Sequence, residues 1–210
     1  MRHRPFLQAT VRSQDRVIVG VVLAAGTSER LGRPKQLLEL EGKPLLQHAV
    51  DRAAAYFDEV VVVLGHEAEA IEAALRLPSN ARTVLNERFA EGHHGSVRVG
   101  FATASREGAD VALLLGDQPY LGDDLIARTV EWFRDSAADV VRPRHGEAPG
   151  HPVLVRADTA ALLASGEDEQ LGPALRGPQV EWVDGGPEAP ADVDTWENYE
   201  ALVNKGTARG

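Results

Sequence analysis

Short apolar runs alternate with amphipathic stretches along most of this chain. The apolar runs are rich in valine and leucine, which is typical of buried strands. They cover residues 17–24, 60–64, 82–85, 111–115, 140–142, 152–155 and 180–183. Between them, periodic patterns predict helices over residues 45–56, 67–77, 97–105, 123–133 and 157–164. The alternation predicts an α/β protein with a mostly parallel, buried central sheet.

Composition narrows the class of protein. The 210 residues, 43% of them hydrophobic, are enough for one domain. We expect residues 16–205 to form a single domain and residues 1–15, which are basic but lack the apolar core of a secretion signal, to form a flexible extension. The net charge of −10 argues against a nucleic-acid partner.

Two absences in the sequence exclude further classes. The chain has no cysteine, which excludes a disulfide framework, a thiolate metal site and a cysteine nucleophile. No apolar run approaches the length of a membrane span, so we expect no membrane association. Together these features fit a cytoplasmic protein.

The loop that follows the first predicted strand carries the main chemical signal. It opens with the small residues of segment 24–28 and then places three cations between Arg30 and Lys35. A strand that ends at a glycine-bearing turn exposes backbone N–H groups that suit a phosphate, and ligands of parallel sheets bind beyond this end of the strands. The spacing is neither a Walker A loop nor a dinucleotide fingerprint, because Gly26 and Gly32 lie too far apart. The alternative is an ordinary polar loop.

Carboxylates provide the second signal. Asp117 follows the apolar run 113–115, which places an oxygen ligand suited to Mg²⁺ at the strand end that carries the loop. Asp192 and Asp194 alternate on an extended segment and should face one side, ahead of a terminal helix that Thr195 is expected to cap. The alternative interpretations are that Asp117 caps a turn and that the other two acids are solvated.

Three histidines and a serine are weaker candidates. Segment 86–96 lies between a predicted strand and a predicted helix, and Ser96 is expected to cap that helix. The side chains of His93 and His94 should point apart, and the sequence places no further metal-ligating residue at a suitable spacing from them. We therefore expect a polar loop or a substrate-phosphate contact rather than a metal site. His151 precedes a proline and is therefore extended, and a structural role and a substrate contact both remain open.

Several motifs of the chain, taken in the order in which they occur, resemble those of the MobA-like nucleotidyltransferase superfamily. The matching segments are Leu23-Ala24-Ala25-Gly26, Arg30-Leu31-Gly32, Pro34-Lys35, Leu115-Gly116-Asp117-Gln118-Pro119, Gly150-His151-Pro152 and Asp192-Val193-Asp194-Thr195. The chain departs from the family pattern at Leu31, Glu87 and Trp196, and after Gly166 it lacks the Gly-Ala-Arg that often holds the acceptor. The resemblance implies a three-layer, Rossmann-like nucleotidyltransferase fold.

The resemblance also implies roles for individual residues. The residues expected to bind the nucleotide are Leu23, Ala24, Ala25, Gly26, Lys35, Asn86 and Ser96. By the same match, Lys35 and Arg30 are the catalytic cations that stabilise phosphate charge. Asp117 and Asp194 hold the magnesium ion (Mg²⁺), and His151 lies in the acceptor half of the site.

The implied reaction is nucleotidyl transfer without a protein nucleophile. An acceptor phosphate oxygen attacks the α-phosphorus of an NTP, and pyrophosphate leaves. Ala25 and Gln118-Pro119 resemble the molybdenum cofactor cytidylyltransferase (MocA-like) branch, with CTP as donor, molybdopterin as acceptor and a molybdenum enzyme as client. One alternative is cytidylyl transfer to a sugar or polyol phosphate such as methylerythritol phosphate, which Pro34-Lys35-Gln36 also resembles. Another is a non-catalytic nucleotide or cofactor carrier for molybdenum enzymes.

Overall fold

The computed structural model describes residues 16–105, 108–166 and 168–207, so the expected extension over residues 1–15 lies outside the described part. The strands of this part are β1 (Ile18–Leu23), β2 (Glu39–Leu40), β3 (Lys43–Pro44), β4 (Glu59–Leu64), β5 (Ala81–Leu85), β6 (Asp110–Leu115), β7 (Val140–His145), β8 (Ala148–Pro149), β9 (Val153–Val155) and β10 (Val180–Asp184). The α-helices are α1 (Leu45–Tyr56), α2 (Ala68–Ala74), α3 (His93–Ala104), α4 (Asp123–Asp135), α5 (Ala157–Ser165), α6 (Asp168–Arg176) and α7 (Trp196–Thr207). Short 3-10 helices occur at η2 (Glu29–Leu31), η3 (Lys35–Leu37) and η4 (Phe89–Glu91).

The central sheet has eight strands in the order β10-β7-β9-β6-β1-β4-β5, with β8 paired to β7. Strand β1 lies between β6 and β4 and runs parallel to both, and β5 and β10 are parallel to their neighbours. Within this sheet, as far as the structure describes it, only β9 and β8 pair antiparallel with their neighbours, and β2 and β3 form a separate antiparallel pair. The predicted α/β fold with a mostly parallel sheet is confirmed.

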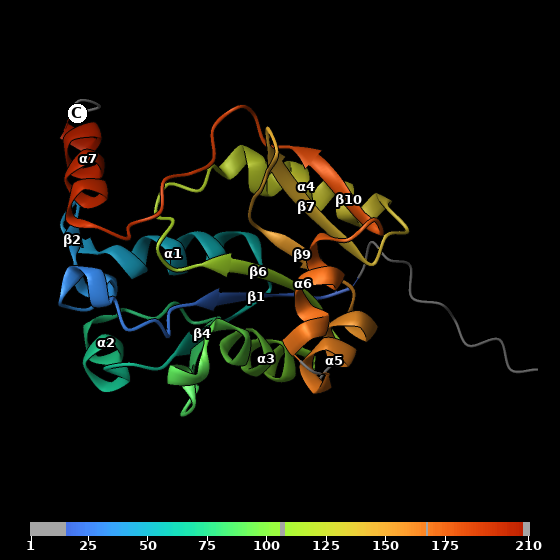
Figure 1. Ribbon diagram of the computed structural model, residues 1–210, viewed down its shortest axis with the longest axis horizontal. Coiled ribbons are helices and arrows are strands. Elements are labelled where there is room, and N and C mark those ends of the chain that lie inside the picture. Colours follow the sequence, from blue (N-terminus) through green and yellow to red (C-terminus); the bar gives the residue numbers. More distant parts are fainter. Residues whose placement is uncertain (1–15, 106–107, 167, 208–210) are drawn as a thin grey trace, which may run out of the picture.

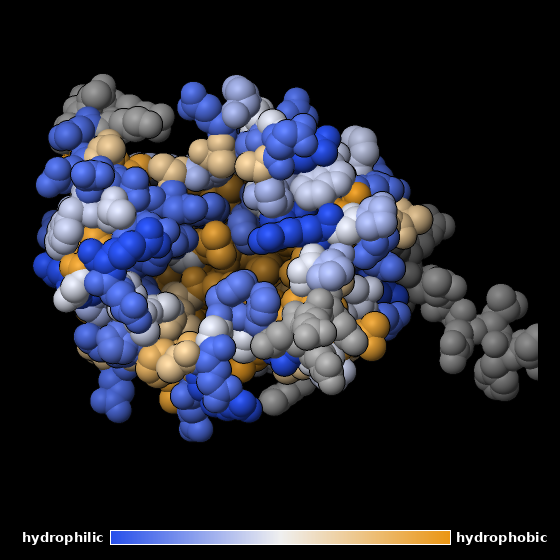
Figure 2. Space-filling view, in the orientation of Figure 1, coloured by the Kyte–Doolittle hydropathy of each residue, from blue (hydrophilic) through white to orange (hydrophobic). Residues whose placement is uncertain are grey.

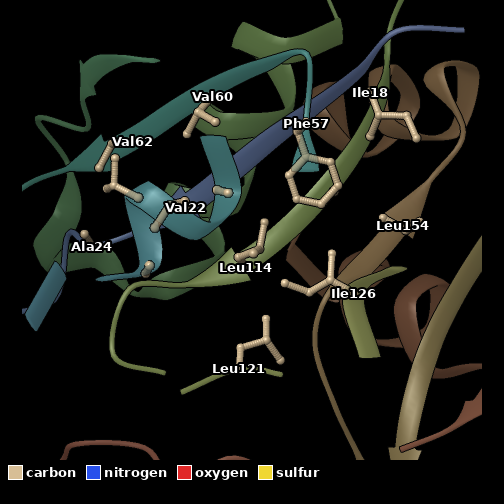
Figure 3. Close-up of a cluster of buried hydrophobic side chains, with 14 of the residues drawn as sticks. Ile18, Val22, Ala24, Phe57, Val60, Val62, Leu114, Leu121, Ile126 and Leu154 are labelled. Atoms are coloured by element: carbon tan, nitrogen blue, oxygen red, sulfur yellow. The ribbon is translucent and has the colours of Figure 1, made fainter. Parts of the chain in front are cut away.

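Helices cover both faces of the sheet, which gives three layers (Figure 1). Successive side chains of a strand face opposite sides, so Val22 packs toward α1 and α4 whereas Val21 packs toward α3, α5 and α6. Figure 3 shows the first of these two clusters, in which Val22 of β1, Leu114 of β6 and Ile126 of α4 gather between sheet and helices. Burial on both faces explains why the strands are continuous apolar runs.

Two helices differ from the sequence prediction. Helix α3 begins at His93 with Gly92 as its N-cap, so the expectation that Ser96 caps this helix is wrong, and Ser96 lies inside the first turn. Helix α6 was not predicted, because Gly172 and Pro173 interrupt its apolar pattern. Both helices border the cavities described below.

Strands β1, β4 and β6 end side by side, and this arrangement positions the candidate site. The backbone pairing continues one residue beyond β1, where Ala24 N–H donates to Val63 O at 2.9 Å and Gly116 N–H donates to Leu23 O at 2.9 Å. The C-terminal segment returns to the same place, because Val193 N–H donates to Asp117 O at 3.2 Å. Helix α7 then begins with Thr195 as its cap, as predicted, since Asn198 N–H donates to Thr195 Oγ1 at 3.3 Å.

Within the described ranges, no helix is both long enough and apolar enough to cross a bilayer.

Candidate active site

Four charged side chains converge beyond the ends of β1 and β6. Lys35 Nζ lies 2.5 Å from Asp117 Oδ2 and 2.8 Å from Asp194 Oδ1. Arg30 Nη2 lies 2.8 Å from Asp194 Oδ2. The structure therefore brings together the two predicted catalytic cations and the two predicted metal carboxylates, although 159 residues separate Lys35 from Asp194.

Burial strengthens the central ion pair. The side chains of Lys35 and Asp117 are only 16% and 18% exposed. Burial alone would lower the pKa of Lys35, but the charge of Asp117 and the hydrogen bonds to both carboxylates outweigh it and raise that pKa. The hydrogen bond from Lys35 lowers the pKa of Asp194. Both groups are charged at neutral pH.

A buried glutamine holds the loop that leads to these cations. Gln36 is 3% exposed, and its Nε2 donates to Ala24 O at 2.7 Å and to Gly26 O at 3.2 Å. Ser28 adopts a left-handed φ of 57°, and its hydroxyl accepts a hydrogen bond from Lys35 N–H at 3.1 Å. The backbone of the loop is thus fixed at both ends, so the loop presents Lys35 from a defined position.

A cavity of about 520 Å³ opens beside the charged cluster. Small residues form one wall, namely Ala24, Ala25 and Gly26, and Lys35 and Asp117 stand at its side. Figure 2 shows a hollow with an apolar floor near the middle of this face, bordered by hydrophilic side chains. A shallow apolar cavity with a few charged groups on one side suits a nucleotide, whose base is flat and whose phosphates are anionic.

The two polar residues predicted from segment 86–96 occupy different positions. Ser96 lines the cavity. Asn86 is 3% exposed and lies behind Ser96, where its Nδ2 donates to Ser96 Oγ at 3.0 Å and its Oδ1 accepts from Arg88 N–H at 3.1 Å. Asn86 therefore orders the loop and is not among the residues that line the cavity.

A second cavity of about 300 Å³ adjoins the first, and both are lined by Leu23, His93 and Leu115. Polar groups reach it from His94 of α3, Arg142 of β7, His151 and Arg176 of α6. The rings of His93 and His94 have centroids 4.2 Å apart, so these histidines do not point apart as expected.

The charge state of this second cavity is set by burial. His151 Nδ1 lies 3.2 Å from Leu113 O, and burial and the nearby Arg142 lower the pKa of His151 to about 4. The ring is therefore neutral at pH 7, with Nδ1–H donating to the carbonyl and Nε2 left as an acceptor. Burial and the charge of Arg176 lower the pKa of Arg142 to about 10, which still leaves its guanidinium charged.

Arg142 is a functional candidate that the sequence did not reveal. It is 4% exposed and donates to Gly150 O at 2.8 Å and to Leu175 O at 2.9 Å. It thereby ties β7 to the segment before His151 and to α6. Its only sequence signal is a cation in a strand-like run, which does not distinguish a buried residue from an exposed one.

Comparison with known proteins agrees with this geometry. A profile of the MobA-like NTP transferase domain matches residues 20–181. This chain belongs to the MobA-like NTP transferase family. It is a nucleotidyltransferase by family, and the resemblance found in its motifs is confirmed.

Relatives of this MobA-like chain carry different names. Nicotine blue oxidoreductase of Paenarthrobacter nicotinovorans is 30% identical over 198 residues, covering 89% of this chain and 96% of that protein. The bifunctional protein GlmU of Burkholderia orbicola (strain MC0-3) is 32% identical over 157 residues, covering 73% of this chain. The chain spans about a third of the length of GlmU, 34%.

Solved structures support the same fold. Rv0371c from Mycobacterium tuberculosis H37Rv has a TM-score of 0.76 and 32% sequence identity, covering 90% of this chain and 98% of that one. The same protein has been solved in complex with manganese, with a TM-score of 0.74. A divalent cation therefore binds a protein that is similar to this chain.

The residues of this MobA-like site fit a hard divalent cation. Asp117 Oδ1 is buried without a hydrogen-bond partner, and so is Oε1 of the neighbouring Gln118, which is 7% exposed. The described residues hold no cluster of three or more histidine and acidic side chains placed as metal ligands. Mg²⁺ usually takes one or two carboxylates and completes its shell with substrate phosphates and water, and Asp117 and Asp194 match that requirement.

Proposed function

We propose that this MobA-like protein transfers CMP from CTP to the terminal phosphate of molybdopterin and releases pyrophosphate. The observation that carries the proposal is the convergence of Lys35, Asp117 and Asp194 beside the cavity lined by residues 24–26. The choice of CTP and molybdopterin rests on the resemblance of Ala25 and the Gln118-Pro119 pair to the cytidylyltransferase branch.

The chain's residues account for the chemistry as alignment and charge stabilisation. An acceptor phosphate oxygen forms a bond to the α-phosphorus as the bond from that phosphorus to the leaving pyrophosphate breaks. The ammonium of Lys35 and the guanidinium of Arg30 stabilise the negative charge that develops on the phosphates. Asp117 and Asp194 would hold Mg²⁺, which supplies Lewis-acid stabilisation of the same charge when bound. No protein nucleophile is required.

The adjoining cavity is the proposed acceptor site. It meets the nucleotide cavity at Leu23 and Leu115, so an acceptor bound there lies next to the nucleotide. The guanidiniums of Arg142 and Arg176 attract an anionic acceptor, and neutral His151 offers Nε2 to an N–H or O–H group. The cytoplasm as location and a molybdenum enzyme as the client that receives the product belong to the same proposal.

The test is pyrophosphate release from each of the four NTPs with Mg²⁺, with and without molybdenum-loaded molybdopterin. We expect release that is specific to CTP, depends on the pterin, is lost in Asp117→Ala and is retained in the control Asp51→Ala. Asp51 is a suitable control because it also pairs with a lysine, Lys43 at 2.6 Å, but lies outside the cavities.

Three outcomes would contradict the proposal. Turnover with methylerythritol phosphate or another sugar or polyol phosphate would keep the chemistry and replace the acceptor. Nucleotide binding without pyrophosphate release would favour a carrier. Oxidation or reduction of nicotine blue, without pyrophosphate release, would assign the chain to the chemistry in the name of its relative.

A further inference from the structure

Cations of the protein itself occupy most of the oxygens that a metal would need. Of the four oxygens of Asp117 and Asp194, Lys35 Nζ contacts one on each residue, at 2.5 and 2.8 Å. Arg30 Nη2 contacts the second oxygen of Asp194 at 2.8 Å. Asp117 Oδ1 is the remaining oxygen and has no hydrogen-bond partner. The ammonium thus lies between the two carboxylates that would hold the divalent cation.

We propose that Lys35 and Arg30 keep these carboxylates closed to a divalent cation until the phosphates of a nucleotide draw the two cationic side chains away. Metal and nucleotide then bind with strong mutual dependence, and the metal alone binds weakly. This inference rests on the proposed function in assuming that the cavity receives a nucleoside triphosphate.

Electrostatics supports the exclusion. A dication placed against the two carboxylates would approach an ammonium that is held there by two hydrogen bonds and largely shielded from water. Repulsion between like charges is much stronger in such a partly buried position than in bulk water. The triphosphate relieves it by giving both cations new partners.

The structure allows the side chains to move without the loop moving. Ser28 and Gln36 fix the backbone on either side of Lys35. Lysine itself is a long flexible chain with a point charge at its end. Arg30 is 66% exposed, so its guanidinium swings into solvent or toward phosphate at little cost. The change of partner from carboxylate to phosphate therefore requires only the rotation of these two side chains.

The first experiment measures binding of Mn²⁺ alone, by electron paramagnetic resonance of the free ion, with no nucleotide present. We expect Lys35→Met to bind Mn²⁺ at least about tenfold more tightly than wild type, within the usual range of coupling between sites. Lys43→Met is the matched control, since Lys43 pairs with Asp51 at 2.6 Å, and it should leave the affinity unchanged. Adding Asp117→Asn to Lys35→Met should abolish the gain. Equal or weaker binding by Lys35→Met would overturn the inference.

A second experiment needs no variant. The chain has three lysines, Lys35, Lys43 and Lys205, so the side-chain nitrogens of ¹⁵N-labelled lysine give a simple spectrum. We expect the Lys35 signal to shift with Mg²⁺ and CTP together, to stay in place with Mg²⁺ alone at the same concentration, and the Lys43 signal to stay in place throughout. A Lys35 shift that saturates equally well with Mg²⁺ alone would refute the inference.

These measurements are independent of turnover. Neither requires an acceptor, and the Mn²⁺ titration does not require a nucleotide. A protein that fails to use molybdopterin but shows the tenfold gain in Lys35→Met would disprove the proposed reaction and retain the inference. A protein that uses molybdopterin but shows no gain in Lys35→Met would support the proposed reaction and disprove the inference.

Discussion

The ammonium of Lys35 lies 2.5 Å from a carboxylate oxygen of Asp117, although 82 residues separate the two in the chain. The pair joins the loop after β1 to the loop after β6, and both residues stand beside the cavity that we assign to the nucleotide. A second lysine–aspartate pair, Lys43 and Asp51, has nearly the same length, 2.6 Å, but both of its members are about 40% exposed. Comparing variants of the two pairs therefore separates the effect of a lysine's position beside the cavity from the effect of removing a lysine charge.

We therefore expect Lys35→Met to lower kcat for pyrophosphate release by at least about 100-fold, because a cation directed at developing phosphate charge contributes on that scale. Lys43→Met should keep the wild-type rate. Initial rates at saturating CTP and Mg²⁺ measure both. Similar losses in the two variants would mean that Lys35 acts only as a surface charge.

Replacing Gln36 by Leu should loosen the nucleotide loop. The change leaves Ala24 O and Gly26 O without the donor that now reaches both. Ala24 is buried, and leaving its carbonyl without this partner costs about 1–3 kcal/mol of unfolding free energy, which urea denaturation measures. Because the loop lines the cavity, KM for CTP should also rise. Gln179→Leu, at an exposed site, is the control and should change neither quantity.

Two glycines near the site should differ in how their replacement by alanine affects stability. A Cβ on Gly116 would lie 2.9 Å from Leu23 O and 2.8 Å from Leu46 Cδ1, so Gly116→Ala should destabilise the fold by about 1–3 kcal/mol through overpacking. A Cβ on Gly26 would meet nothing within 4 Å, and Gly26→Ala should leave stability unchanged. Since Gly26 lines the cavity, that variant should weaken nucleotide binding. Thermal melting and CTP titration, run on both variants, distinguish these effects.

The half-buried His151 makes stability depend on pH. The pKa of His151 falls from 6.5 to about 4 on folding, so below pH 6.5 the unfolded chain takes up a proton before the folded one does. His151 therefore leaves the free energy of unfolding unaffected above about pH 6.5. As the pH falls toward 4, proton uptake by the unfolded chain lowers that free energy by an amount on the order of 3 kcal/mol. His151→Gln should remove this part of the pH dependence. Urea denaturation from pH 7 to pH 4.5 tests it, and parallel curves for the two proteins would contradict it.

The alternation of strands and helices was predictable because strands that are buried on both faces of the sheet consist almost entirely of apolar residues. The runs at 60–64 and 111–115 coincide with β4 and β6 almost residue for residue. Helix α6 was not predictable, because Gly172 and Pro173 are unfavourable within a helix and only packing of Leu171 and Leu175 against the sheet compensates for them.

The same contrast applies to the site. Lys35, Asp117 and Asp194 stand next to glycine turns or strand ends, where local pattern indicates a ligand, and the structure brings them together. Gln36 and Arg142 are polar residues in buried positions. Whether such a residue is buried depends on which distant segments cover it, and a pattern along one stretch of chain does not contain that information.

The return of the C-terminal segment also determines when during synthesis the site is complete. The nucleotide loop, the sheet strands β1, β4 and β6, and Asp117 all leave the ribosome before Asp194 does, because residues are added from the N-terminus onward. Val193, fully buried against Leu31, Leu38 and Leu45, docks this last segment onto a scaffold that is already made. A growing chain therefore acquires the loop after β1 and Asp117 first and its second carboxylate late, so a chain that ends before Asp194 lacks one of the two acids proposed to hold the metal.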